Sequence, residues 1–228
     1  MKKIQLLLLI LIPICVVGQK DTTGNTIAES KTEKKEHRSL GLGIKAGLNF
    51  TNITSAADVN NSSETGFQVG IFLDPGKGKI LGSRTELVYS RQAYNYATGL
   101  TTGKVYLDYI MLSQLMAINI TRFVQIQVGG QMAYLINAKA DSSKPSTGNA
   151  SIDNALDFFN RFDAGFGLGL ELRPYKGILL GARYNLSLTN LYKMPDSYSS
   201  GDTPSYVPSS DNLNFKNNLI QVYAGYRF

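Results

Sequence analysis

Charged side chains recur at alternate positions within segments of this chain that are otherwise apolar or built of small residues. Such side chains can form ion pairs, bind a charged ligand or line a path for ions. Both signs of charge are present, and a buried charge is costly unless it is paired, so paired charges are the simplest expectation. The residues concerned are Lys45, Arg84, Glu86, Arg161, Asp163, Glu171, Arg183 and Arg227.

Catalytic and metal-binding residue types are scarce. The chain has one histidine, His37, and one cysteine, Cys15, so it cannot assemble a Cys/His zinc cluster or an internal disulfide. His37 lies in a polar stretch ahead of the patterned segments, which removes the commonest general base from them. The closely spaced Gly165, Gly167 and Gly169 continue a strand pattern and do not open a helix, unlike a phosphate-binding loop. We therefore expect a non-enzymatic protein with no catalytic residue, metal or cofactor.

Net charge and hydropathy exclude two further classes. The 228 residues carry 23 Lys and Arg against 17 Asp and Glu, a formal net charge of +6. These bases are scattered along the chain, whereas nucleic-acid-binding proteins cluster them, so no nucleic-acid partner is expected. A mean hydropathy of −0.10 is too polar for a bundle of transmembrane helices, each of which needs about 20 apolar residues.

The N-terminal region predicts export. Residues 1–18 have the organisation of a signal peptide, with a basic start, an apolar run and tolerable small residues before the cleavage position. The alternatives are an uncleaved membrane anchor and a lipid attached to Cys15. Residues 19–39 are polar and of mixed charge, which predicts a disordered periplasmic lead-in. The remaining residues, 40–228, are expected to form a single domain.

From Gly41 onward, apolar residues alternate with small or polar ones. Because successive side chains of a strand point to opposite faces, this alternation predicts strands with one apolar face. Eight strands are expected, within 41–50, 66–73, 80–91, 104–120, 123–135, 158–172, 178–189 and 216–228. Only the segment 104–120 is apolar on both faces, and a bulge near Ser113 is expected to reconcile its register.

Strand length and the composition of the second face favour a membrane barrel. Most of these strands are about nine to thirteen residues long, which matches the ~9–11 residues that cross a bilayer, whereas globular strands have ~5–6. A soluble barrel would place charges on its outer face, but the face opposite the apolar one is rich in Gly, Gln, Asn and Ser. The predicted fold is all-β, an eight-stranded antiparallel up-and-down transmembrane β-barrel in the outer membrane of a Gram-negative bacterium. The alternative is a soluble periplasmic ligand-binding β-barrel.

The connections and the aromatic residues agree with this prediction. Short connections at 74–79, 121–122 and 173–177 alternate with long ones at 51–65, 92–103, 136–157 and 190–215. Outer-membrane barrels have short periplasmic turns and long extracellular loops, with aromatic girdles at both interfaces. The aromatic residues expected in the girdles are Phe50, Phe67, Tyr89, Tyr134 and Phe162 at the long-loop ends, and Tyr226 and Phe228 at the opposite end.

Seven segments in this order carry a family resemblance: GLGIKAGLNFTNI, RTELVYSRQ, VYLDYI, QVGGQMAYLINAK, RFDAGFGLGLELRP, GARYNLSLTNL and NLIQVYAGYRF. Together the set, which spans 41–228, resembles the outer-membrane β-barrel domain proteins of the Bacteroidetes type, often called PorT-like. The chain departs from that family at Met111-Leu112-Ser113, where an Ile-Pro pair is usual. The resemblance implies that Tyr226 and Phe228 form the C-terminal insertion signal read by the barrel assembly machinery. It also implies a role in an envelope or secretion assembly.

Eight strands limit what the interior can do. At about this strand number side chains just fill a barrel, so a wide pore is not expected. The eight charged residues are instead expected to face inward as a structural network of paired lumen charges. The expected function is that of a non-enzymatic barrel in outer-membrane lipid, acting on an extracellular ligand through its loops or on another envelope protein. A narrow outer-membrane channel is the further alternative.

Overall fold

The computed structural model describes residues 41–54, 64–74, 80–98, 101–141, 155–193 and 216–228, all within the unit formed by residues 38–228. The predicted signal peptide and lead-in, residues 1–39, lie outside the described residues. The described part of the chain contains no helix that is long and apolar enough to cross a membrane.

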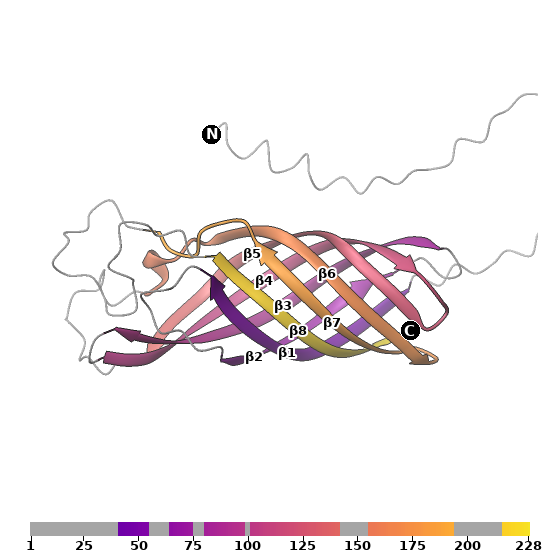
Figure 1. Cartoon of the computed structure of the whole chain (residues 1–228), viewed down its shortest axis with the longest axis horizontal. Helices are drawn as coiled ribbons and strands as arrows, with labels where there is room; N and C mark the ends of the chain where they lie inside the picture. The colour runs from indigo at the N-terminus through magenta and orange to yellow at the C-terminus, as the bar shows by residue number, and fades with distance from the viewer. Residues whose placement is uncertain (1–40, 55–63, 75–79, 99–100, 142–154, 194–215) are drawn as a thin grey trace, which may run out of the picture. The chain divides into compact units, whose positions relative to one another are not determined.

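Eight antiparallel strands form a closed barrel in which each strand pairs with its sequence neighbours and the first pairs with the last (Figure 1). They are β1 (Leu42–Thr54), β2 (Thr65–Leu73), β3 (Leu81–Thr98), β4 (Thr101–Asn119), β5 (Val124–Asp141), β6 (Phe162–Tyr175), β7 (Ile178–Ser187) and β8 (Lys216–Arg227). A short 3-10 helix, η1 (Ala155–Phe158), precedes β6. The predicted all-β class and the eight-stranded antiparallel up-and-down barrel are confirmed. Closure leaves no unpaired strand edge.

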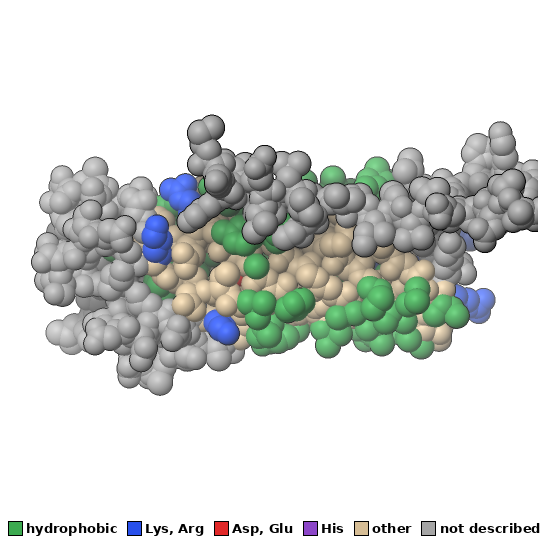
Figure 2. Space-filling view, turned by 90° about the horizontal axis from the view of Figure 1, so that it is seen from above, with side chains coloured by type: hydrophobic (Ala, Val, Ile, Leu, Met, Phe, Trp, Pro, Cys, Tyr) green, Lys and Arg blue, Asp and Glu red, His purple; other side chains and the backbone are tan. Residues whose placement is uncertain are grey.

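The apolar faces of the strands point outward. On β1, Ile44 and Leu48 are 50% and 49% exposed, whereas the alternating Lys45 and Asn49 are 2% and 0% exposed. The same alternation runs along β6 and β7. Figure 2 shows hydrophobic side chains gathered over the strands, with Lys and Arg side chains toward the two ends of the barrel. An apolar exterior this extensive suits lipid and not water.

The two ends of the barrel differ in their connections. The connections β2–β3, β4–β5 and β6–β7 lie at one end, the short-turn end, where β8 also finishes. The others lie at the opposite, long-loop end. The long loop expected over 92–103 is wrong, because β3 continues to Thr98 and β4 starts at Thr101, and these two threonines pair with each other. The residues between Gln92 and Gly103 include Tyr, Ala and Thr, and the β3–β4 ladder continues through them.

The expected bulge near Ser113 is also wrong. Ser113 pairs regularly with Glu86 on β3 and Gln131 on β5. The register shift lies earlier in β4, between Asp108 and Tyr109. These residues pair with Asn137 and Leu135, so that Ile136 is the extra residue on β5. β4 is apolar on both faces without any change of register at Ser113. Its inward side chains line an apolar section of the interior, while its outward ones continue the apolar exterior.

Candidate functional site in the barrel lumen

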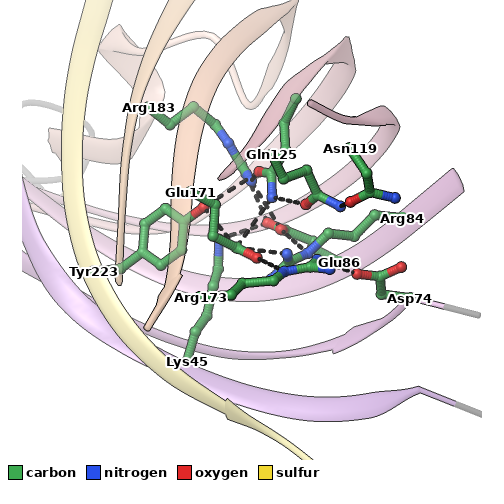
Figure 3. A network of polar contacts seen from close by, with 11 residues as sticks. Lys45, Asp74, Arg84, Glu86, Asn119, Gln125, Glu171, Arg173, Arg183 and Tyr223 are labelled. Carbon is green, nitrogen blue, oxygen red and sulfur yellow. Dashed lines mark hydrogen bonds and ion pairs between the residues drawn. The ribbon is translucent and has the colours of Figure 1, made fainter. Parts of the chain in front are cut away.

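A network of charged side chains crosses the interior toward the short-turn end (Figure 3). Its first centre is the carboxylate of Glu86 on β3. Arg183 on β7 donates to both of its oxygens, at 2.6 and 2.8 Å. Lys45 on β1 donates at 2.5 Å, and the Nε of Arg84 lies 2.8 Å from Oε1. One carboxylate therefore holds cations from three different strands.

The carboxylate of Glu171 on β6 is the second centre. Arg84 Nη1 lies 2.6 Å from it and Arg173 Nε 3.0 Å, so Arg84 joins the two centres. Arg173 also pairs with Asp74 at 2.6 Å, which extends the network to the short-turn rim. Gln127 on β5 donates to Glu171 at 3.1 Å. Strands from all around the barrel are thus tied together through a continuous set of ion pairs and hydrogen bonds.

Aromatic rings complete this layer. The Tyr223 hydroxyl lies within hydrogen-bonding distance of two acceptors, Gln127 Oε1 at 3.2 Å and Glu171 Oε2 at 3.3 Å, and the Lys45 ammonium lies 4.6 Å from the centroid of its ring. The guanidinium of Arg84 lies 3.9 Å from the Phe72 ring centroid. Rings of this kind stabilise cations that have lost their water. Glu86 and Glu171 are fully buried, so no room is left for a water molecule against either carboxylate.

The structure separates the eight charged residues expected in the lumen. It brings together Lys45, Arg84, Glu86, Glu171 and Arg183. Asp163 lies apart, toward the long-loop end, and accepts hydrogen bonds from Ser187 and Thr189.

The other two expected residues lie at the ends of strands. Arg227, near the end of β8, donates to the backbone oxygen of Asp74 at 2.7 Å. Arg161 does not face the lumen as expected. Its side chain is exposed, because β6 begins only at Phe162 and Arg161 precedes the wall.

The network also contains residues that the sequence analysis did not expect in it, among them Gln127, Arg173, Tyr223 and Asp74. Gln127 and Arg173 share the inward parity of their strand neighbours Gln125 and Glu171, and this signal could have found them. Tyr223 likewise shares the inward parity of Gln221 on β8. Asp74 follows the end of β2 in a turn, where the period of two gives no information.

Toward the long-loop end the interior is apolar. Its buried cluster comprises Val88, Tyr94, Val105, Leu107, Tyr109, Met111, Ala133, Leu135, Phe158, Phe159, Leu191, Tyr192 and Leu219. Apart from Leu219 on β8, the strand residues of this cluster come from β3, β4 and β5. The other four members, Phe158, Phe159, Leu191 and Tyr192, come from the β5–β6 and β7–β8 connections. We call these four residues the plug. Two connections therefore pack into the barrel and do not merely cover it.

Specific contacts hold the plug in place. Phe159 forms an isolated bridge with Tyr192, and their ring centroids are 5.2 Å apart. The hydroxyls of Tyr94 on β3 and Tyr192 lie 2.9 Å apart. Burial raises the pKa of the Tyr192 hydroxyl to about 12. Within the ranges that the structure describes, no group of His, Cys, Asp or Glu is placed to hold a metal ion.

The exterior carries aromatic residues near both ends. Phe67, Tyr134 and Phe162 are exposed toward the long-loop end, and Tyr134 and Phe162 are paired neighbours. At the short-turn end the rings of Tyr226 and Phe228 are exposed and meet edge to face, with centroids 5.4 Å apart. Two further exposed aromatic residues at this end, Phe123 and Tyr175, were not expected from the sequence.

Comparison with known proteins gives the family. Residues 21–193 match the family model described as outer membrane protein beta-barrel domain. Ail, the attachment invasion locus protein of Yersinia pestis, is 13% identical, with 82% of this chain and 99% of that chain covered and a TM-score of 0.44. Neisserial surface protein A is 15% identical, with 82% and 97% covered and a TM-score of 0.49. Outer membrane protein AlkL is 14% identical, with 91% and 97% covered and a TM-score of 0.42. No curated protein matches the chain. The chain belongs to the outer membrane protein beta-barrel domain family, which places it in the outer membrane.

Proposed function

We propose that this protein is a non-enzymatic outer-membrane barrel with a permanently filled lumen, which acts through the connections at its long-loop end. The observation that carries the proposal is the filling of both halves of the interior. The short-turn half holds the charged network, and the other half holds the apolar cluster with its plug. A barrel filled in this way is a rigid support and not a conduit.

Burial argues against conduction. Arg84, Glu86 and Glu171 in the charged layer are 0% exposed, as are Leu107 and Leu135 in the apolar layer. Ions cross a pore together with water, and a wall that water cannot touch offers no such path. The buried ion pairs would also have to separate, which costs several kcal/mol for each charge left alone. A narrow channel is therefore a weaker interpretation than a closed support.

The plug supports a role for the long-loop end. Phe158 and Phe159 anchor the end of the β5–β6 connection, and Leu191 and Tyr192 anchor the start of the β7–β8 connection. Binding residues commonly lie on loops that a rigid framework positions. The proposed partner is an extracellular ligand or a second envelope protein, and a PorT-like role in a secretion assembly of the Bacteroidetes type is the more specific form of this proposal.

Export and assembly complete the proposal. Residues 1–18 act as a cleaved signal peptide, residues 19–39 as a periplasmic lead-in, and residues 40–228 as the barrel, with the short turns in the periplasm. Tyr226 and Phe228 act as the insertion signal for the assembly machinery, and their exposure leaves both rings accessible. The alternative of a soluble periplasmic barrel is disfavoured because it would leave the apolar faces of β1, β6 and β7 in water.

Planar-bilayer recording of the purified full-length barrel tests the closed lumen. We expect no stable conductance steps from the wild-type protein under conditions in which a porin inserted from the same detergent conducts. A heat-modifiable band on an unboiled gel confirms that the sample is folded. Reproducible, stable conductance from folded protein would contradict the closed barrel and favour a channel.

A further inference from the structure

The short-turn end contains a cavity of about 950 Å³ that plays no part in the proposed filling of the lumen. It lies between the β4–β5 turn, the β6–β7 turn and the end of β8. In Figure 1 these two turns project at the end of the barrel where the C-terminus lies. We call this feature the rim cavity. Its walls include both the outward face of the barrel and the mouth of the lumen.

Every charged side chain that lines the rim cavity is basic. They are Arg122 in the β4–β5 turn, Arg173 and Lys176 around the β6–β7 turn, and Arg227 on β8. The acidic side chains next to the cavity among those described, Asp74 and Glu171, are buried and already paired with Arg173. Arg122 and Lys176 are exposed. The Nε of Arg227 is buried and has no hydrogen-bond partner within the described part of the chain. The cavity is therefore electrostatically suited to an anion.

Apolar side chains share the same walls. Ile80, Tyr175 and Phe228 are 75%, 73% and 64% exposed, and Phe123 and Ile178 are exposed as well. Side chains of this kind at the end of an apolar barrel wall lie at the depth where lipid headgroups meet acyl chains. An occupant that satisfies both features has an anionic head and a hydrophobic tail.

We propose that the rim cavity binds the phosphate headgroup of an anionic phospholipid, whose acyl chain lies along the outward apolar residues beside it. This rests on the proposed orientation, in which the short turns face the periplasm and hence the phospholipid leaflet. Arg122 and Lys176 attract the headgroup from the two turns, and Arg227 supplies a donor between them. The chain's own residues 19–40 are a poor alternative occupant, because five bases against four acids give them no excess negative charge.

Retention of lipid by the purified barrel in a neutral detergent tests this proposal. Phosphatidylglycerol and phosphatidylcholine with identical acyl chains are titrated in, and protein-bound lipid is counted by native mass spectrometry. We expect the wild-type protein to prefer phosphatidylglycerol by about thirtyfold, since each of the two accessible bases contributes about 1 kcal/mol near an anionic lipid and 1.4 kcal/mol corresponds to a factor of ten. Inorganic phosphate at the same concentration is not expected to displace the lipid, because it lacks the acyl chain.

The double variant Arg122→Gln/Lys176→Gln is expected to lose this preference. The matched control is Lys139→Gln/Lys193→Gln, which removes two exposed bases from the long-loop end and is expected to keep it. All four side chains are exposed, and heat modifiability verifies folding in each case. Equal retention of the two lipids by the wild-type protein, or an equal loss in both double variants, would overturn the proposal. The readout does not depend on conduction, so a conducting barrel that still selects phosphatidylglycerol would contradict the proposed function alone.

Discussion

Glu86 and Arg183 are 97 residues apart in the chain and meet inside the barrel, where both terminal guanidinium nitrogens donate hydrogen bonds to the carboxylate. They belong to β3 and β7, which are not neighbours in the sheet. Backbone hydrogen bonds connect each strand only to the next one, so this pair adds a link across the interior. The link is fully desolvated, which makes it sensitive to the loss of either partner.

Replacing Glu86 by Gln is expected to lower the free energy of unfolding by about 3–5 kcal/mol, because Lys45, Arg84 and Arg183 then share a buried site without their common anion. Urea titration of the barrel in lipid vesicles, followed by tyrosine fluorescence, measures the change. Glu64→Gln is the matched control, since Glu64 pairs with Lys104 where both side chains are partly exposed to solvent. Equal stabilities of the two variants would show that the lumen network is not stabilising.

The plug gives a second prediction. Phe159 is 1% exposed and packs against Tyr192, so Phe159→Ala is expected to destabilise the barrel by about 3–5 kcal/mol through the cavity that it leaves. Limited proteolysis of the folded protein should then cut the β7–β8 connection faster. Phe166→Ala removes an outward ring of the same size and serves as the control. Unchanged cleavage in Phe159→Ala would mean that the plug does not hold this connection.

The third prediction concerns Gly181 on β7, which lies against the ring of Tyr223. A Cβ at Gly181 would meet the Tyr223 ring at 2.4 Å. Gly181→Ala must therefore displace Tyr223 from Gln127 and Glu171, and we expect a loss of about 1–3 kcal/mol from overpacking. Gly130→Ala is the control, because a Cβ there has no atom within 4 Å. The urea midpoints of the two variants check this, and a stable Gly181→Ala would indicate that Tyr223 can move freely.

The C-terminal ring gives a fourth prediction, which separates recognition from stability. Phe228 is largely exposed, so Phe228→Ser should refold in detergent as well as the wild-type protein does. In cells, however, we expect the amount of folded barrel in the outer-membrane fraction to fall several-fold, because the assembly machinery loses its signal. Phe166→Ser, which removes another exposed ring, is the control for surface hydrophobicity. Normal assembly of Phe228→Ser would contradict the proposed signal.

The sequence determined the orientation of most side chains. The alternation predicts inward positions for Lys45, Glu86 and Arg183, because adjacent side chains in a strand take opposite faces and a period of two is readable without a structure. The number of strands follows from the same pattern, whereas the expected long connection over 92–103 is replaced by a continuation of β3 and β4. The exposure of Arg161 marks the limit of this reasoning, because the pattern does not say where the strand begins.

Only the tertiary structure decided which inward residues meet. The partners of Glu86 depend on how far each strand is staggered when the barrel closes, and sequence spacing contains no measure of that stagger. The apolar inner face of β4 is likewise explained only by the tertiary structure. Phe158 and Phe159, from the β5–β6 connection, belong to the same buried cluster as its side chains. Local alternation fixes the face of each side chain, whereas contacts across the lumen arise from closure of the whole sheet.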